Sequence, residues 1–252
     1  VSPRLGISHV ITSQATFTFN YGLYYQTPIY QNVYLNTNRL TNPQEYFEET
    51  EGFLGNATMS AARTQSYEFA FNIQMNRFWA FSLGGWVKDM DQLITSRFVR
   101  SGVYKYCVFD NGDYGSAKGI DFTLQNRGMT FSTVIQYTLS IAKANSAYDW
   151  ETLGLPALDA PSQEYLMGFD RTHDLTISIY TKKLPFGVQA GLTGFYESGT
   201  PYTPYKKLTS IYDSPEVDEK NKNSERSPNY KMINLNLSKN IKFGDVKMTV
   251  GM

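Results

Sequence analysis

The sequence predicts an all-β fold: an antiparallel up-and-down transmembrane β-barrel, to which this chain contributes about ten strands. Three observations predict it. Apolar and polar residues alternate with a period of two in ten segments, and no long window shows the period of a helix. Short and long connections between these segments alternate along the chain. The mean hydropathy is −0.38, as expected where each strand averages an apolar face with a polar one.

The first two strands are expected at residues 3–11 and 16–25. The second has the clearest alternation in the chain, because its odd-numbered positions are all aromatic or leucine. Its even-numbered positions are mostly small or polar. Successive side chains of a strand point to opposite faces, so this segment presents one apolar face and one polar face.

Eight more segments follow the same pattern. They cover residues 66–75, 78–88, 119–125, 131–141, 174–179, 188–197, 233–238 and 246–251. In water their apolar faces would need a second packed layer, whereas in lipid they need none. The uninterrupted strands run to roughly 9–13 residues, which suits a tilted crossing of the bilayer.

The connections place the loops. Short links fall near residues 12–14, 76–77, 127–128, 184–186 and 243–244, and long links cover 26–62, 89–113, 143–170 and 198–228. All tight turns therefore lie at one end of the sheet and all long loops at the other, which is the layout of an outer-membrane barrel. A soluble β-sandwich mixes its loop lengths and uses Greek-key connections.

Composition excludes several kinds of function. The 23 basic and 23 acidic residues give no net charge, which argues against binding to nucleic acid. No apolar run approaches the length of a transmembrane helix. Cys107 is the only cysteine, so no internal disulfide or cysteine metal cluster forms. His173 and Asp174 are adjacent on a strand and face opposite ways, which excludes a triad with Ser178. We predict no catalytic residue, no metal site and no cofactor.

Candidate ligand-binding residues lie in two long connections. Residues 26–62 contain Tyr30, Tyr34 and Tyr46, and the link after residue 197 contains Tyr202 and Tyr205. Loops on a rigid scaffold often carry binding residues, and tyrosine combines a stacking ring with a polar hydroxyl. The alternative is an ordinary solvated loop.

Three acidic residues fall on the polar strand faces: Glu68, Asp121 and Glu197. A charge facing lipid is costly, so these carboxylates are expected to face the lumen. There they have two possible environments. They either pair with basic residues of a domain that plugs the barrel, or they are hydrated in a water-filled lumen.

Several sequence blocks resemble the barrel of the TonB-dependent outer-membrane receptors, in a style typical of Bacteroidetes. They occur in the family's order over nearly the whole chain. The blocks are FTFNYG at 17–22, RTQSYE at 63–68, FSLGGWVKDMDQLI at 81–94, NGDYGSAKGIDFTL at 111–124, SGTPYTP at 198–204 and NLNLSKNI at 234–241.

The resemblance implies residence in the outer membrane of a Gram-negative bacterium, in contact with its lipid. Members of the family have about 22 strands around a plug domain. This chain has about ten strands and no plug, so we interpret residues 1–252 as an internal, C-terminal part of such a barrel. The family imports scarce nutrients without covalent chemistry. The implied partners are the plug, TonB through the plug, and a small-molecule, glycan or peptide ligand.

Two alternatives stay open at this point. One is a complete ten-stranded outer-membrane protein that acts as an adhesin or a surface protease. A protease would need Asp170, His173 and Asp174 to converge at the outer rim. The other alternative is a soluble secreted β-protein, which would fold in water without detergent.

Overall fold

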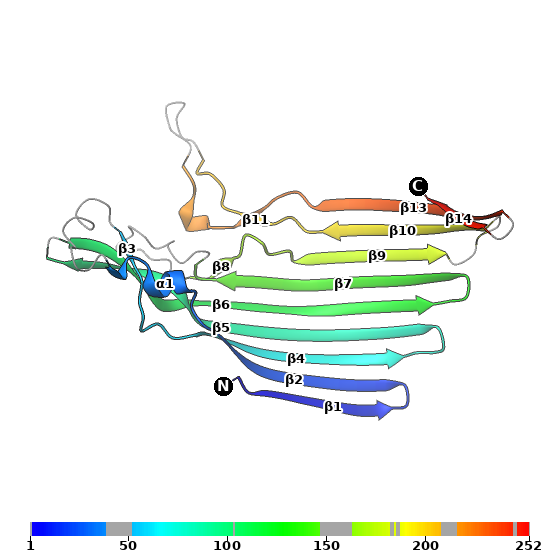
Figure 1. The fold of residues 1–252 in the computed structure, drawn as a ribbon, viewed down its shortest axis with the longest axis horizontal. Helices are drawn as coiled ribbons and strands as arrows, with labels where there is room; N and C mark the ends of the chain where they lie inside the picture. Colours follow the sequence, from blue (N-terminus) through cyan, green and yellow to red (C-terminus); the bar gives the residue numbers. More distant parts are fainter. Residues whose placement is uncertain are drawn as a thin grey trace.

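The computed structural model contains one large antiparallel sheet, and all ten expected strands are present in it (Figure 1). The structure describes residues 2–38, 52–102, 104–146, 163–181, 184, 187–207, 216–243 and 246–251. The ten strands are neighbours in chain order, in the sequence β1-β2-β4-β5-β6-β7-β9-β10-β13-β14. This meander confirms the predicted fold class.

Each strand overlaps its predicted segment, but β5, β6 and β13 extend well beyond theirs. The turns lie at one end of the sheet and the loops at the other (Figure 1). The ten strands are β1 (Arg4–Thr12), β2 (Ala15–Gln26), β4 (Ala62–Gln74), β5 (Trp79–Ser101), β6 (Tyr104–Arg127), β7 (Phe131–Ala144), β9 (His173–Thr181), β10 (Val188–Glu197), β13 (Tyr230–Phe243) and β14 (Val246–Gly251).

Shorter elements lie in the long connections. They are α1 (Tyr30–Tyr34), β3 (Phe53–Leu54), β8 (Tyr165–Leu166), β11 (Pro201–Tyr202), the short 3-10 helix η3 (Glu219–Asn221) and β12 (Glu225–Arg226). Strand β3 pairs in parallel with β6, β8 pairs with β7, and β11 pairs with β12. Within the described residues, no helix is long and apolar enough to cross a membrane.

The strand register keeps one apolar face and one polar face across the whole sheet. Phe19 lies opposite Phe69, whereas the next residue, Asn20, lies opposite Glu68. We call the face that carries Phe19 the apolar face and the face that carries Asn20 the polar face. The same alternation continues through every neighbouring pair as far as β13, where Leu235 of the apolar face lies opposite Leu192.

The apolar face is exposed. Its side chains include Ile120, Ile233 and Leu235, which are 50%, 76% and 60% exposed. The buried apolar residues of the described chain instead lie in the loops or toward the loop ends of strands, and they are Leu54, Cys107, Phe109, Ala144, Tyr165 and Met167. The middle of the sheet therefore has no covering layer among the described residues. Such a surface is stable only in an apolar solvent, which fits a face toward lipid.

The predicted loop at residues 89–113 is wrong, because β5 and β6 continue through it as one long hairpin. The register shifts between Met90 and Ile94, and Gln92 has a positive φ of 55°. This bulge changes which residues of β5 share a face. The apolar–polar alternation of residues 78–88 therefore does not continue beyond it. The side-chain amide of Asn111 donates to the backbone oxygen of Gln92 over 2.8 Å and stabilises the bulge.

Candidate functional site

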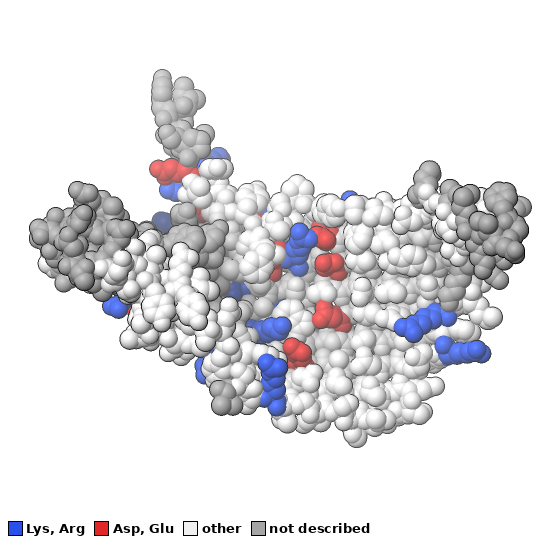
Figure 2. Space-filling view, in the orientation of Figure 1, with Lys and Arg blue, Asp and Glu red and all other residues white. Residues whose placement is uncertain are grey.

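A band of acidic side chains crosses the polar face. It comprises Glu68 of β4, Asp121 of β6, Asp174 of β9 and Glu197 of β10. Asp121 lies opposite Thr138, Thr138 opposite Asp174, and Asp174 opposite Glu197. Figure 2 shows acidic side chains in such a band, with basic side chains on its loop side. Asp174 is not among the predicted lumen charges, although it shares the parity of the polar residues of its strand.

Asp121 joins three strands. One of its carboxylate oxygens accepts a hydrogen bond from the indole nitrogen of Trp86 over 3.0 Å, and the other accepts from the hydroxyl of Thr138 over 2.7 Å. The indole lies close against Gly119, where a Cβ would come within 2.7 Å of the ring. A glycine at this position therefore lets Trp86 lie flat on the wall of β6, and Asp121 holds it there.

We expect Asp121→Ala to release Trp86 and Thr138 together and to destabilise the protein by about 1–3 kcal/mol, because two polar partners lose their acceptor. Tryptophan fluorescence of the folded protein should show a more mobile indole, measured as lower anisotropy. Asp121→Asn keeps one acceptor oxygen and should retain most of the effect of the native residue. Equal losses in both variants would contradict a role for these hydrogen bonds.

The other three acids of the band differ in their partners. Glu197 forms an ion pair with Arg171, and Glu68 accepts a hydrogen bond from the hydroxyl of Ser66 over 3.1 Å. The side chain of Asp174 has no hydrogen-bond or ion-pair partner within the part of the chain that the structure describes. Like charges placed directly opposite each other on neighbouring strands are destabilising. Asp174 lies opposite Glu197, so its negative charge is not compensated at this position.

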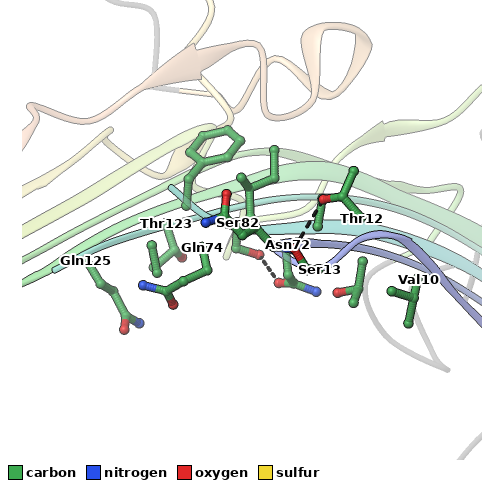
Figure 3. Close-up of a pocket in the computed structure, with 14 residues that line it drawn as sticks. Val10, Thr12, Ser13, Asn72, Gln74, Ser82, Thr123 and Gln125 are labelled. Atoms are coloured by element: carbon green, nitrogen blue, oxygen red, sulfur yellow. Dashed lines mark hydrogen bonds between the residues drawn. The ribbon is translucent and has the colours of Figure 1, made fainter. Parts of the chain in front are cut away.

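Three hollows on the described part of the polar face bear on the candidate site. A hollow of about 440 Å³ lies over Glu68, Trp86, Lys88 and Asp121. A second, of about 520 Å³, lies at the turn end and is lined largely by neutral amides and hydroxyls (Figure 3). In it, the hydroxyl of Ser82 donates to the side chain of Asn72 over 2.8 Å. The third hollow, of about 410 Å³, lies beside Arg171 and Glu197. A concave polar surface of this kind fits the inside of a barrel.

Two candidate tyrosines form an exposed aromatic pair. Tyr30 and Tyr34 lie on α1, are 83% and 61% exposed, and stack with ring centroids 6.1 Å apart. Figure 1 shows α1 at the loop end, in front of the sheet. Figure 2 has the same orientation and shows the charged polar face in front, so α1 lies on the side of that face. Tyr46 lies outside the described residues.

The other two tyrosines lie in the connection between β10 and β13. The hydroxyl of Tyr202 donates to the carboxylate of Glu225 over 2.7 Å, and this hydrogen bond raises the pKa of Tyr202. Tyr205 is 69% exposed, and its backbone forms an isolated antiparallel β-bridge with Val217. The structure therefore pairs Tyr30 with Tyr34, but no described hydrogen bond or ring contact joins them to Tyr202 or Tyr205.

A buried ion pair anchors this second loop. The side chain of Asp170 is 1% exposed, and its carboxylate accepts from the guanidinium of Arg226 over 2.6 Å. Arg226 also donates to the hydroxyl of Thr172 over 2.7 Å and to the backbone oxygen of Gly199 over 2.9 Å. The second oxygen of Asp170 accepts from the backbone N–H of Ala142 over 2.7 Å. Arg226 is not predicted from the sequence, since no local pattern links it to a residue 56 positions away.

The three residues that a surface protease would need do not converge. Asp170 forms an ion pair with Arg226, and Asp174 lies on the polar face. His173 lies on the apolar face, where its Nδ1 is 2.9 Å from the hydroxyl of Tyr137. Within the described ranges, no group of three or more His, Cys, Asp and Glu side chains is arranged to hold a metal ion.

Comparison with known proteins identifies the family. The family model described as TonB dependent receptor-like, beta-barrel matches residues 1–252. No sequence among the curated proteins matches the chain significantly.

Solved structures agree with the family model. The outer membrane transporter YddB from Escherichia coli superposes with a TM-score of 0.66 at 10% identity, over 94% of this chain and 34% of that one. A mutant of the ferric enterobactin receptor PfeA from Pseudomonas aeruginosa, in complex with enterobactin, gives 0.62 at 12% identity, over 99% and 34%. The FrpB iron transporter from Neisseria meningitidis gives 0.60 at 12% identity, over 94% and 32%.

The chain spans about a third of the length of these structures. At such low identity the likeness shows the shared fold. The match of the family model over the full sequence, the ten-stranded meander and the exposed apolar face all point the same way. The chain belongs to the TonB-dependent receptors of the Gram-negative outer membrane, and it forms part of their β-barrel.

Proposed function

We propose that the protein imports a scarce nutrient across the outer membrane by TonB-coupled active transport, and that this chain forms part of the wall of the import path. The observation that carries the proposal is the pairing of an exposed apolar face with a concave, charged polar face on one continuous sheet. A barrel wall needs both faces, because one meets lipid and the other meets water or a plug.

The nutrient is a small molecule, a glycan or a peptide that is first met by the loops. Tyr30 and Tyr34 form a ready stacking surface, and Tyr202 and Tyr205 supply a second one. Among the similar structures, FrpB is an iron transporter and PfeA is a ferric enterobactin receptor, which supports the inclusion of a metal chelate among the ligands to be tested.

The acidic band is the proposed contact for a plug domain. Asp121 already accepts two hydrogen bonds, and Glu197 is paired with Arg171. Glu68 and Asp174 retain more capacity to accept from a basic side chain. We therefore propose that plug arginines or lysines bind chiefly at Glu68 and Asp174, while Asp121 and Glu197 shape the wall around them.

Uptake by cells tests the transport proposal. The intact protein is expressed in cells with and without functional TonB, and accumulation of a ferric siderophore, an oligosaccharide and an oligopeptide is followed. We expect one of them to accumulate only with TonB and only in the absence of a proton uncoupler. Accumulation at the same rate without TonB would contradict the proposal.

Sensitivity to a large hydrophilic antibiotic tests the plug contact. We expect the double variant Glu68→Gln, Asp174→Asn to increase sensitivity about tenfold, because loss of two charge-assisted contacts loosens the plug. Asp89→Asn is the matched control, since Asp89 lies near the middle of β5 but on the apolar face. If both variants leave the cells as resistant as the wild type, the plug is held by other residues.

A further inference from the structure

Two basic side chains lie on the polar face at the loop side of the acidic band: Arg4 of β1 and Lys88 of β5. The register puts them at one level. Arg4 lies opposite Gly22, Gly22 opposite Ser66, and Ser66 opposite Lys88. Three strand spacings separate the two backbones, which corresponds to about 14 Å. The side chains are long enough to approach the same bound molecule.

Both cations lie close to aromatic rings that pack over glycines of the sheet. The guanidinium carbon of Arg4 lies 4.6 Å from the ring centre of Tyr24, and the ammonium of Lys88 lies 5.5 Å from that of Trp86. Tyr24 folds over Gly22, where a Cβ would come within 2.8 Å of the ring. Trp86 lies over a glycine of β6 in the same way, and Asp121 anchors its indole nitrogen.

This arrangement orients the two charges before any ligand arrives. Cation–π contacts hold a guanidinium or an ammonium in place without neutralising it. Among the described residues, neither Arg4 nor Lys88 forms an ion pair. The nearest acid of the band, Glu68, lies diagonally across from Lys88 and accepts instead from Ser66. Both positive charges therefore remain available to an external anion.

We propose that Arg4 and Lys88 form an anion-binding pair at the loop end of the lumen, and that the imported ligand carries carboxylate or phosphate groups. The inference rests on the proposed function, because it names the ligand class for that import path. The acidic band lies directly below the pair and repels anions, so an anionic ligand is held at the mouth until the path opens. The hollow over Lys88 and Trp86 is also lined by Glu68 and Asp121, so the anion binds at the loop-side edge of this hollow, away from the two carboxylates.

Binding of inorganic tripolyphosphate to the intact protein in detergent tests the inference. We expect Arg4→Gln and Lys88→Gln each to weaken binding roughly three- to tenfold, and the double variant to weaken it at least thirtyfold, since each removes one charge-assisted contact. Lys88→Arg should bind nearly as tightly as the wild type. Arg77→Gln is the matched control, because Arg77 also stacks on an aromatic ring, 5.7 Å from the centre of Phe78, but in the β4–β5 turn at the opposite end.

Two results would overturn the proposal. One is equal binding by the double variant and the wild type. The other is a wild-type protein that binds no tripolyphosphate at millimolar concentration, which would mean that the two cations are used within the protein itself. The change in gel mobility on heating checks that each variant is folded. Binding in detergent needs neither TonB nor energy. Loss of TonB-dependent uptake with intact binding therefore removes only the transport proposal, and the reverse pattern removes only this one.

Discussion

Replacing Arg226 with methionine is expected to free the connection between β10 and β13 from the rest of the loop end. Asp170 would then keep a buried negative charge without its partner, a loss of about 3–5 kcal/mol for a buried ion pair broken from one side. Arg226 also ties the backbone of Gly199 to the start of β9, so the effect should spread through the whole loop. Hydrogen–deuterium exchange of the intact protein should show lost protection at residues 198–207 and 216–229.

Two further variants make this expectation specific. Lys206→Met breaks the exposed ion pair with Glu216 in the same loop, and exposed pairs contribute only about 0–1 kcal/mol. It should leave the exchange pattern nearly unchanged. The double variant Asp170→Asn, Arg226→Met leaves no buried charge and should be less destabilised than Arg226→Met alone. Equal effects of Arg226→Met and Lys206→Met would show that the pair does not anchor the loop.

A charge placed on the apolar face should have the second large effect. Leu192 is 41% exposed and lies in the middle of β10. Leu192→Arg is expected to destabilise the membrane-inserted barrel by about 2–4 kcal/mol, because the guanidinium would face the bilayer interior. Thr193→Arg, one residue further on, points to the polar face and should cost less than about 1 kcal/mol.

The measurement is the fraction of each variant that reaches the outer membrane in a form whose gel mobility changes on heating. Wild type and Thr193→Arg should behave alike, and Leu192→Arg should be depleted. If Thr193→Arg were the depleted variant, the faces would be assigned the wrong way round. If both variants inserted equally well, neither face would lie against lipid.

Much of the fold could be predicted from the sequence because a barrel strand reports its two environments residue by residue. In residues 16–25, all odd-numbered positions are aromatic or leucine, and all even-numbered positions except Tyr24 are small or polar. The register of β2 follows from that separation. The β5–β6 hairpin could not be predicted in this way. Its bulge at Gln92 shifts the phase of alternation, and no residue type marks such a shift in advance.

The candidate site divides along similar lines. The polar-face positions of Glu68, Asp121 and Glu197 follow from strand parity alone, and the register places all three on that face. The hydrogen-bond partners of the acidic residues cannot be predicted from strand parity. Trp86 reaches Asp121, and Arg226 reaches Asp170, only after segments distant in sequence are brought together. Roles in ligand or plug binding remain predictions for the experiments above.

The length of the β5–β6 hairpin has a consequence for how a cell presents this protein. A tilted strand crosses the hydrocarbon core in about 9–11 residues, whereas β5 and β6 have 23 and 24. About a dozen residues of each strand, roughly 40 Å at the usual rise, therefore project outward. Because β5 and β6 are much longer than the other described strands, their projecting ends are the natural place for a surface epitope or an inserted tag.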